Sequence, residues 1–241
     1  MAGKRFERRG SGSRSTRSGA GTPEADRTNA KGEGSQSDVE ALSAQEVLAQ
    51  AVEDHHPRLA LACSFQKEDA VLVHMLLGLV PDARVFTIDT GALFPETYAT
   101  WRELEQRTGV TVEVLDAMSE DGRRWTAEHC CGERKVAALD RALEGLDAWV
   151  TGLRREQAPT RTKAAKVGWD ERHRLWKVSP LADWGEKRVW EYIHDHDLPY
   201  NPLHDRGYAS IGCVPCTRPG AGREGRWAGQ AKTECGLHSG Q

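Results

Sequence analysis

The sequence lacks long apolar runs and has no excess of charge of one sign. No stretch of the 241 residues approaches the roughly 18 apolar residues of a membrane helix, and the N-terminus has no apolar signal core. The formal net charge is -3, which argues against bulk electrostatic binding of nucleic acid. No internal repeat is present. These absences predict a soluble, cytoplasmic protein that acts on neither a membrane nor a nucleic acid.

Residues 1–40 have almost no aliphatic side chains. They are rich in Gly, Ser, Arg and Thr, so they cannot bury enough apolar surface to offset chain entropy. We expect a disordered, solvated tail; the alternative, a transit peptide, lacks its amphipathic face. The composition changes at Ala41, and we expect an α/β nucleotide-binding domain over residues 41–218. Residues 219–241 are rich in glycine and are expected to form a flexible arm.

Short apolar runs alternate with helical patterns through the middle of the chain. This order is typical of a doubly wound, mostly parallel sheet with helices on both faces, followed here by a loop-rich C-terminal segment. Ser43 and Glu46 have the spacing of a capping box. Strands are expected at 59–64, 84–89, 110–115, 148–152 and from Lys177 toward Asp183, and helices at about 43–54, 70–80, 96–108, 122–143 and 186–195.

Three polar turns follow expected strands, where ligands of such sheets bind. The turn Ser64–Asp69 offers backbone N–H groups and a helix dipole to a phosphate or sulfate, although an ordinary connection fits it equally well. The second turn is Asp89–Gly91. The third, Gly152–Arg161, contains arginines that could bind such an anion, and Arg223 and Arg226 form a similar group. Lys163 and Lys166 are expected on a solvated surface.

The six cysteines suggest a metal or redox centre and a nucleophile. Four of them fit a structural zinc or an iron–sulfur cluster, with disulfides as the alternative: Cys130, Cys131, Cys213 and Cys216. Cys63 lies in an apolar run and is interpreted as a buried thiol. Cys235 has no apolar surroundings and stands three residues before His238, so we interpret it as a candidate nucleophile.

Eight motifs occur in one order from Leu59 to His238. They resemble those of the assimilatory adenylyl-sulfate reductases, relatives of the phosphoadenylyl-sulfate reductases within the adenosine-nucleotide α-hydrolase superfamily. The motifs include Ser64-Phe-Gln-Lys-Glu-Asp69, Cys130-Cys-Gly-Glu-Arg-Lys135, Thr151-Gly-Leu-Arg-Arg155, Ile211-Gly-Cys-Val-Pro-Cys216 and Lys232-Thr-Glu-Cys-Gly-Leu-His238. The resemblance implies a [4Fe-4S] cluster on Cys130, Cys131, Cys213 and Cys216, and this set implies adenylyl sulfate as the substrate.

The resemblance also implies roles for single residues. Cys235 would attack the substrate and become an S-sulfocysteine, assisted by Lys135 and His238. The remaining residues of the implied substrate site are Ser64, Phe65, Asp69, Asp89, Thr90, Gly91, Arg154, Arg155, Arg161, Arg223 and Arg226. No thioredoxin-like domain follows, so we expect a separate thioredoxin or glutaredoxin as reductant. The sequence leaves room for a homo-oligomer.

Three alternatives stay open from the sequence. The first is a phosphoadenylyl-sulfate reductase, which has the same chemistry. The second is an ATP pyrophosphatase of the same superfamily, although its usual Ser-Gly-Gly loop is missing here. The third is a zinc-stabilised nucleic-acid binder that uses the basic tail.

Overall fold

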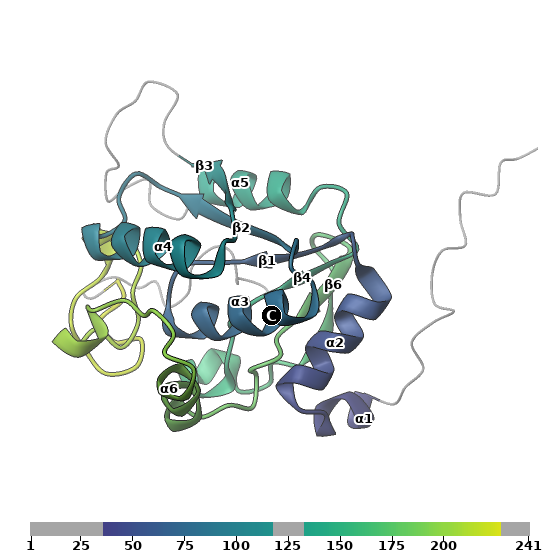
Figure 1. Cartoon of the computed structure of the whole chain (residues 1–241). Coiled ribbons are helices and arrows are strands. Elements are labelled where there is room, and N and C mark those ends of the chain that lie inside the picture. The colour runs from purple at the N-terminus through teal and green to yellow at the C-terminus, as the bar shows by residue number, and fades with distance from the viewer. Residues whose placement is uncertain (1–35, 118–132, 228–241) are drawn as a thin grey trace, which may run out of the picture. The chain divides into compact units, whose positions relative to one another are not determined.

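A single mixed sheet organises the folded part of the chain (Figure 1). The computed structural model describes residues 36–117 and 133–227. Its six strands stand in the order β3 (Val112–Asp116), β2 (Arg84–Asp89), β1 (Leu59–Ala62), β4 (Ala148–Val150), β6 (Leu175–Val178) and β5 (Val167–Asp170). Neighbouring strands are parallel except for the antiparallel pair β5–β6. The predicted doubly wound, mostly parallel sheet is confirmed.

The strands that come after β1 in the sequence lie on both sides of it in the sheet. The chain first builds β2 and β3 on one side and then returns to place β4 on the other side of β1. The crossover connections therefore diverge between β1 and β4. In open α/β sheets such a switch point opens a crevice at the carboxyl ends of the strands.

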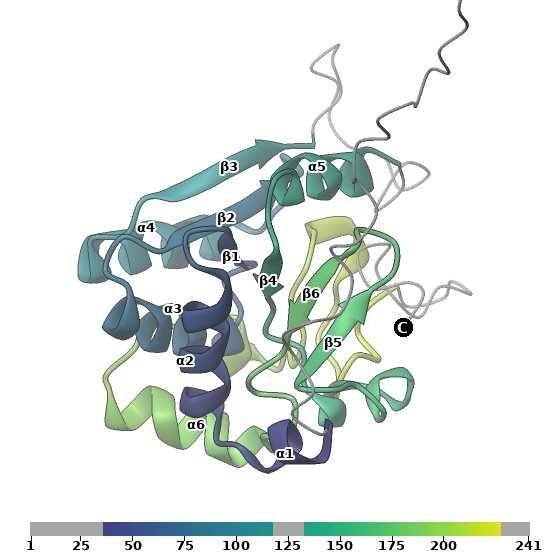
Figure 2. The ribbon, with the colours of Figure 1, turned by 90° about the vertical axis from the view of Figure 1, so that its right-hand side faces the viewer.

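Helices cover both faces of the sheet (Figure 2). One face holds α2 (Ala44–His55), α3 (Lys67–Leu79), α4 (Pro95–Thr108) and α6 (Glu186–Asp195), and the other holds α5 (Glu133–Leu143). Strand β1 serves both cores because its side chains alternate between the faces. Leu59 and Leu61 pack in the larger cluster, and Ala60 packs with Leu139 in the smaller one. No helix among the described residues is long and apolar enough to cross a membrane.

The predicted capping box at the start of α2 is confirmed. The Glu46 N–H donates to Ser43 Oγ at 3.2 Å, and the Ser43 N–H donates to Glu46 Oε2 at 2.7 Å. These two bonds satisfy backbone donors that a helix start leaves open.

The β5–β6 hairpin was not predicted. The sequence analysis expected one strand that begins at Lys177 and enters a turn before Asp183. Strand β6 does end in a turn after Val178, but it begins at Leu175, and strand β5 was not expected. Both hairpin strands are four residues long, and Lys177 is buried over the Trp149 ring at 4.9 Å. A buried lysine breaks the apolar alternation by which such short strands are found.

The folded part begins before Ala41, which corrects the predicted boundary. Helix α1 (Gln36–Ala41) begins within the segment expected to be disordered, and Glu40 Oε1 accepts the Lys166 N–H at 2.8 Å. The Lys166 ammonium donates to Glu40 O at 3.0 Å and Leu42 O at 2.5 Å, and it contacts Asp183 Oδ2 at 2.8 Å. Lys166 is 1% exposed, so the expectation of a solvated lysine was wrong. Residues 1–35 lie outside the described residues.

Residues 219–227 pack against the cysteine turn, which corrects the predicted arm. The Trp227 N–H donates to Cys216 O at 2.9 Å and the Arg218 N–H to Gly225 O at 2.8 Å. Trp227 is buried. A segment that is hydrogen-bonded along its backbone and buried at residues 225–227 does not form a flexible arm. The prediction of a mobile arm now concerns only residues 228–241, which lie outside the described residues.

Candidate active site

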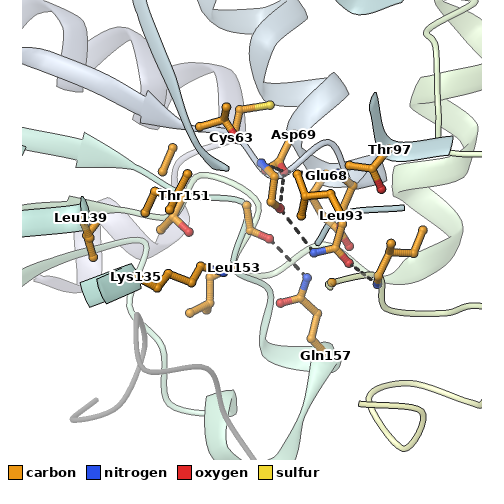
Figure 3. Close-up of a pocket in the computed structure, with 18 of the residues that line it drawn as sticks. Cys63, Glu68, Asp69, Leu93, Thr97, Lys135, Leu139, Thr151, Leu153 and Gln157 are labelled. Carbon is orange, nitrogen blue, oxygen red and sulfur yellow. Dashed lines mark hydrogen bonds between the residues drawn. The ribbon is translucent and has the colours of Figure 1, made fainter. Parts of the chain in front are cut away.

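A pocket opens at the carboxyl ends of β1, β2 and β4, at the switch point of the sheet (Figure 3). Residues that follow β1 and β4 form its walls, and Phe86, Leu139 and Trp149 supply apolar surface. Lys135 extends into it from α5, with Asp69 and Gln157 across from it. Seven of the residues expected in the site line it: Ser64, Asp69, Lys135, Arg161, Cys213, Arg223 and Arg226.

The cationic residues of the pocket come from three separate segments. Lys135 lies in α5, Arg161 ends a short 3₁₀ helix, and Arg223 and Arg226 lie in the C-terminal segment. Arg161 and Arg226 are both buried. Converging guanidinium groups offer forked donors to a sulfate or phosphate, so this wall suits an anionic ligand. We name Lys135, Arg161, Arg223 and Arg226 the basic wall.

Trp227 supports both C-terminal arginines of the basic wall. The guanidinium carbons of Arg223 and Arg226 lie 5.3 Å and 4.6 Å from its ring centroid. Arg226 Nη1 also donates to Ile211 O and Ser210 Oγ, each at 3.3 Å. Gly212 permits this approach, because a Cβ there would collide with the guanidinium. The sequence analysis missed this role, although the run Arg-x-x-Arg-Trp signals it.

The Ser64–Asp69 turn binds a carboxylate of its own. Asp69 Oδ2 accepts the Ser64 N–H at 2.7 Å, the Ser64 hydroxyl at 2.8 Å and the Gln66 N–H at 3.3 Å. Burial raises the Asp69 pKa to about 6, against the lowering effect of these bonds. Two amides expected to be available to a phosphate or sulfate are therefore already occupied. The loop instead presents Asp69 and Glu68 to the pocket.

Phe65 lies in the core and not on the pocket. It is 2% exposed and stacks on Trp101 with ring centroids 5.0 Å apart. Its φ of 59° is unusual for a bulky residue and places the N–H groups of Ser64 and Gln66 on the same Asp69 oxygen. The structure thus gives Phe65 a part in shaping the loop.

The Asp89–Gly91 turn contacts the cysteine segment. Thr90 Oγ1 lies 3.1 Å from Cys213 Sγ, and the Val214 N–H donates to Ala92 O at 2.8 Å. Asp89 Oδ1 accepts the Gly91 N–H and the Tyr98 hydroxyl, and burial together with this carboxylate raises the Tyr98 pKa. None of the three turn residues is among those that line the pocket.

Two of the four expected metal ligands lie beside the pocket. Cys213 precedes the short 3₁₀ helix Val214–Cys216 and Cys216 ends it, and the two residues are 3% and 5% exposed. Two buried thiol groups at this spacing, one within reach of a hydroxyl donor, suit thiolate ligation of a metal centre. Cys130, Cys131, Cys235 and His238 lie outside the described residues, and no group of three metal-binding side chains occurs within the described part.

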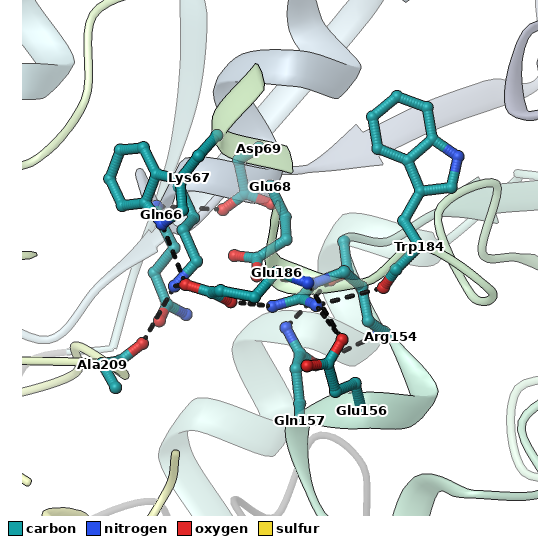
Figure 4. Close-up of polar contacts among 12 residues, drawn as sticks. Gln66, Lys67, Glu68, Asp69, Arg154, Glu156, Gln157, Trp184, Glu186 and Ala209 are labelled. Atoms are coloured by element: carbon teal, nitrogen blue, oxygen red, sulfur yellow. Dashed lines mark hydrogen bonds and ion pairs between the residues drawn. The ribbon is translucent and has the colours of Figure 1, made fainter. Parts of the chain in front are cut away.

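Arg154 belongs to a partly buried ion network next to the pocket (Figure 4). It donates to Glu68 Oε1 at 2.9 Å, to Glu186 Oε2 at 2.6 Å and to Trp184 O at 3.1 Å. Lys67 joins the network through Glu186 Oε1 at 2.9 Å. Arg154 thereby ties the β4 loop to α3 and α6 and lines a second, adjoining pocket.

Arg155 also lies away from the first pocket. It donates to Ala164 O at 2.8 Å and pairs with Glu40 of α1. By contrast, three residues that the sequence analysis did not single out line both pockets: Gln66, Glu68 and Gln157. Neutral or acidic side chains carry no sequence signal of anion binding, so they were passed over.

Comparisons with known proteins agree with this geometry. A family model described as phosphoadenosine phosphosulfate reductase domain matches residues 58–219. The chain is 43% identical over 218 residues to an adenosine 5'-phosphosulfate reductase of Geobacillus kaustophilus, covering 84% of this chain and 92% of that protein. It is 43% identical over 217 residues to a phosphoadenosine 5'-phosphosulfate reductase of Gloeobacter violaceus, covering 83% and 90%.

A solved structure is similar as well. The phosphoadenylyl-sulfate reductase of Candida auris, in a phosphate complex, superposes with a TM-score of 0.65 at 28% identity, covering 76% of this chain and 94% of that one. The sequence comparisons and the fold comparison therefore identify the same group of proteins. The chain belongs to the phosphoadenosine phosphosulfate reductase domain family.

Proposed function

We propose that this protein reduces adenylyl sulfate to sulfite and AMP in sulfate assimilation, with thioredoxin or glutaredoxin as the electron donor. The observation that carries the proposal is the basic wall, which faces a pocket at the switch point and has Cys213 at its edge. Such a pocket suits a nucleotide with one anionic end. Relatives named adenosine 5'-phosphosulfate reductase support this substrate.

The proposed reaction begins with Cys235. Its thiolate attacks the sulfur of adenylyl sulfate, the bond from that sulfur to the phosphate oxygen breaks, and AMP leaves with the electron pair. The product on the protein is an S-sulfocysteine. Because AMP stabilises the departing charge on its phosphate, little acid assistance is needed.

The basic wall answers the main physical obstacle of this step, the approach of an anionic thiolate to an anionic phosphosulfate. Lys135, Arg161, Arg223 and Arg226 place positive charge around the pocket and would stabilise the charge of the transition state. Nearby cations also lower a thiol pKa from its ordinary value of ~8.5. His238 is proposed to assist Cys235 by hydrogen bonding.

The second step is thiol–disulfide exchange. A thiolate of the reductant attacks the sulfur of the modified Cys235, sulfite leaves, and a mixed disulfide forms. The second thiol of the reductant then releases Cys235, so the two electrons come from the dithiol and its disulfide is the oxidised product. We place this exchange in the cytoplasm, where thioredoxin is kept reduced.

We further propose that Cys130, Cys131, Cys213 and Cys216 hold a [4Fe-4S] cluster. The burial of Cys213 and Cys216 and the Thr90 hydroxyl beside Cys213 support this for the described half of the site. The cluster would fix the geometry of the site and add to its electrostatics. In this proposal Thr90 and the neighbouring Ala92 hold the cysteine turn against the loop that follows β2.

The test is sulfite release by the purified protein with thioredoxin, comparing adenylyl sulfate with its 3'-phosphorylated analogue. We expect release from adenylyl sulfate and little from the analogue. The second candidate, reduction of the phosphorylated substrate, is favoured by the name of the Gloeobacter relative. Faster release from the analogue would select that candidate, and no release from either would overturn the proposal.

A further inference from the structure

Gln157 stands at the boundary of the two adjoining pockets and lines both. It ends the short 3₁₀ helix Arg155–Gln157 that follows β4, and Figures 3 and 4 both show it. Its side chain is half-buried. The sequence analysis gave it no role.

Hydrogen bonds at both ends fix the orientation of the Gln157 amide. Oε1 accepts from Arg161 Nη1 at 2.5 Å and from the Arg154 N–H at 3.1 Å. Nε2 donates to Gly152 O at 3.3 Å. A carboxylate could not make the last bond, and an apolar side chain could make none of the three.

Gln157 contacts both neighbouring arginines, the backbone of Arg154 and the side chain of Arg161. Arg154 contacts the carboxylates of Glu68 and Glu186. Arg161, which belongs to the basic wall, receives from Gln157 a hydrogen bond acceptor that is neutral. An amide can hold a guanidinium in place without adding negative charge, whereas a carboxylate at the same distance would attract it and oppose a bound anion.

We propose that Gln157 is a positioning residue for the anionic group of the substrate: it holds the Arg161 guanidinium in the basic wall without adding negative charge to that wall. This inference rests on the proposed function, because it assumes that the anion meets Arg161. The inference explains why an amide is needed at position 157: the side chain must have the shape to contact Arg161 and must carry no negative charge.

The test compares Gln157→Glu and Gln157→Ala in the full-length protein, with AMP and adenosine as probes. Glutamate keeps the shape and the contact to Arg161 but adds a charge, and alanine removes the contact and adds none. We expect the AMP dissociation constant of Gln157→Glu to rise on the order of tenfold or more and to exceed that of Gln157→Ala. Adenosine carries no anion, so its affinity should stay within about twofold in both variants.

Thermal unfolding of the two variants separates positioning from a merely structural role. We expect the two variants to rank differently in stability and in AMP affinity. Gln157→Glu should unfold at the same or a higher temperature than Gln157→Ala, yet bind AMP more weakly. A merely structural role would make the glutamate variant better in both respects. That result, or an equal loss of AMP and adenosine affinity, would overturn the inference.

The proposed function has its own, separate readout. If the unmodified protein bound AMP but released no sulfite, the reaction would be wrong while the variant comparison still decided the role of Gln157. If the unmodified protein did not bind AMP, both the proposed substrate and this inference would be contradicted.

Discussion

The contacts of Asp69 and Arg154 became clear only in the folded structure. Both looked suited to a ligand in sequence, as a polar residue at a strand end and as part of an arginine pair. In the structure Asp69 occupies amides of its own loop, and Arg154 is 3% exposed between carboxylates. Arg161, Arg223 and Arg226 carry the same sequence signal as Arg154 and line the first pocket, as Asp69 also does. Side-chain identity predicted the cations, but only packing decides which of them line the pocket.

The buried carboxyl of Asp69 predicts a pH dependence of stability. Its pKa is raised from 3.8 to about 6, so between these values the folded state holds the proton more tightly than the unfolded chain. The free energy of unfolding therefore contains a contribution that is lost as the pH rises through this window, about 3 kcal/mol in total. Asp69→Asn removes the titration, so the difference in unfolding free energy between the two proteins should change by most of this amount, about 2.4 kcal/mol, between pH 4 and 7. Urea unfolding measures it, and parallel pH profiles would contradict the assignment.

At the scale of elements, the sequence predicted the pieces that local rules determine. The capping box of α2, strand β2 and helix α6 lie where the pattern placed them, because caps and apolar periodicity are read within a few residues. The β5–β6 hairpin was missed because the buried Lys177 breaks its apolar pattern, and α1 was missed because a distant residue stabilises it. Lys166 donates hydrogen bonds to the α1–α2 junction from more than 120 positions away in the chain. A pattern read over a few neighbouring residues cannot reveal a contact at that separation.

Lys166→Met tests the attachment of α1. Removing the ammonium leaves two backbone carbonyl groups and Asp183 without this partner, so we expect a loss of roughly 3 kcal/mol in the free energy of unfolding. Lys163→Met is the matched control, because Lys163 is exposed, and it should change stability by less than about 0.5 kcal/mol. Denaturant unfolding of both variants gives the comparison. Equal effects would show that the buried contacts of Lys166 contribute nothing.

Gly152→Ala tests how closely the β4 loop approaches the Ser64–Asp69 turn. A Cβ at Gly152 would lie 2.8 Å from Asp69 Oδ1 and 2.9 Å from Glu68 Cβ, so the turn must move. We expect a loss of about 2 kcal/mol in stability together with weaker AMP binding. Gly78→Ala is the control: its Cβ meets nothing within 4 Å, and alanine in α3 should stabilise by about 0.5–1 kcal/mol. Unchanged AMP affinity in Gly152→Ala would argue that the turn is not part of the nucleotide site.

At the scale of the whole molecule, three distant parts of the chain meet at one edge of the sheet. The turn after β1 supplies an acidic wall, the loop after β4 supplies Arg161, and the C-terminal segment supplies Cys213, Arg223 and Arg226. Parallel topology makes this meeting predictable, since strands that run together end together. The sequence did not predict which charged side chains line which side of the pocket. That arrangement depends on the ion pairs that Arg154 and Lys67 form with Glu68 and Glu186.

The metal centre is testable by composition. Protein purified without oxygen should contain iron and acid-labile sulfide in equal amounts, and Cys213→Ser should lose both. Cys63→Ser is the control: Cys63 also lines the pocket and is buried, but it lies in the apolar core, so its substitution should leave the iron content unchanged. Zinc in place of iron would refute the cluster.

Mass spectrometry of the protein after exposure to adenylyl sulfate without a reductant tests the central claim, that the pocket delivers a sulfonucleotide to Cys235. The account predicts one sulfo group on the peptide that contains Cys235, absent in Cys235→Ser and released as sulfite when thioredoxin is added. A sulfo group on another residue, or its persistence in Cys235→Ser, would contradict the account.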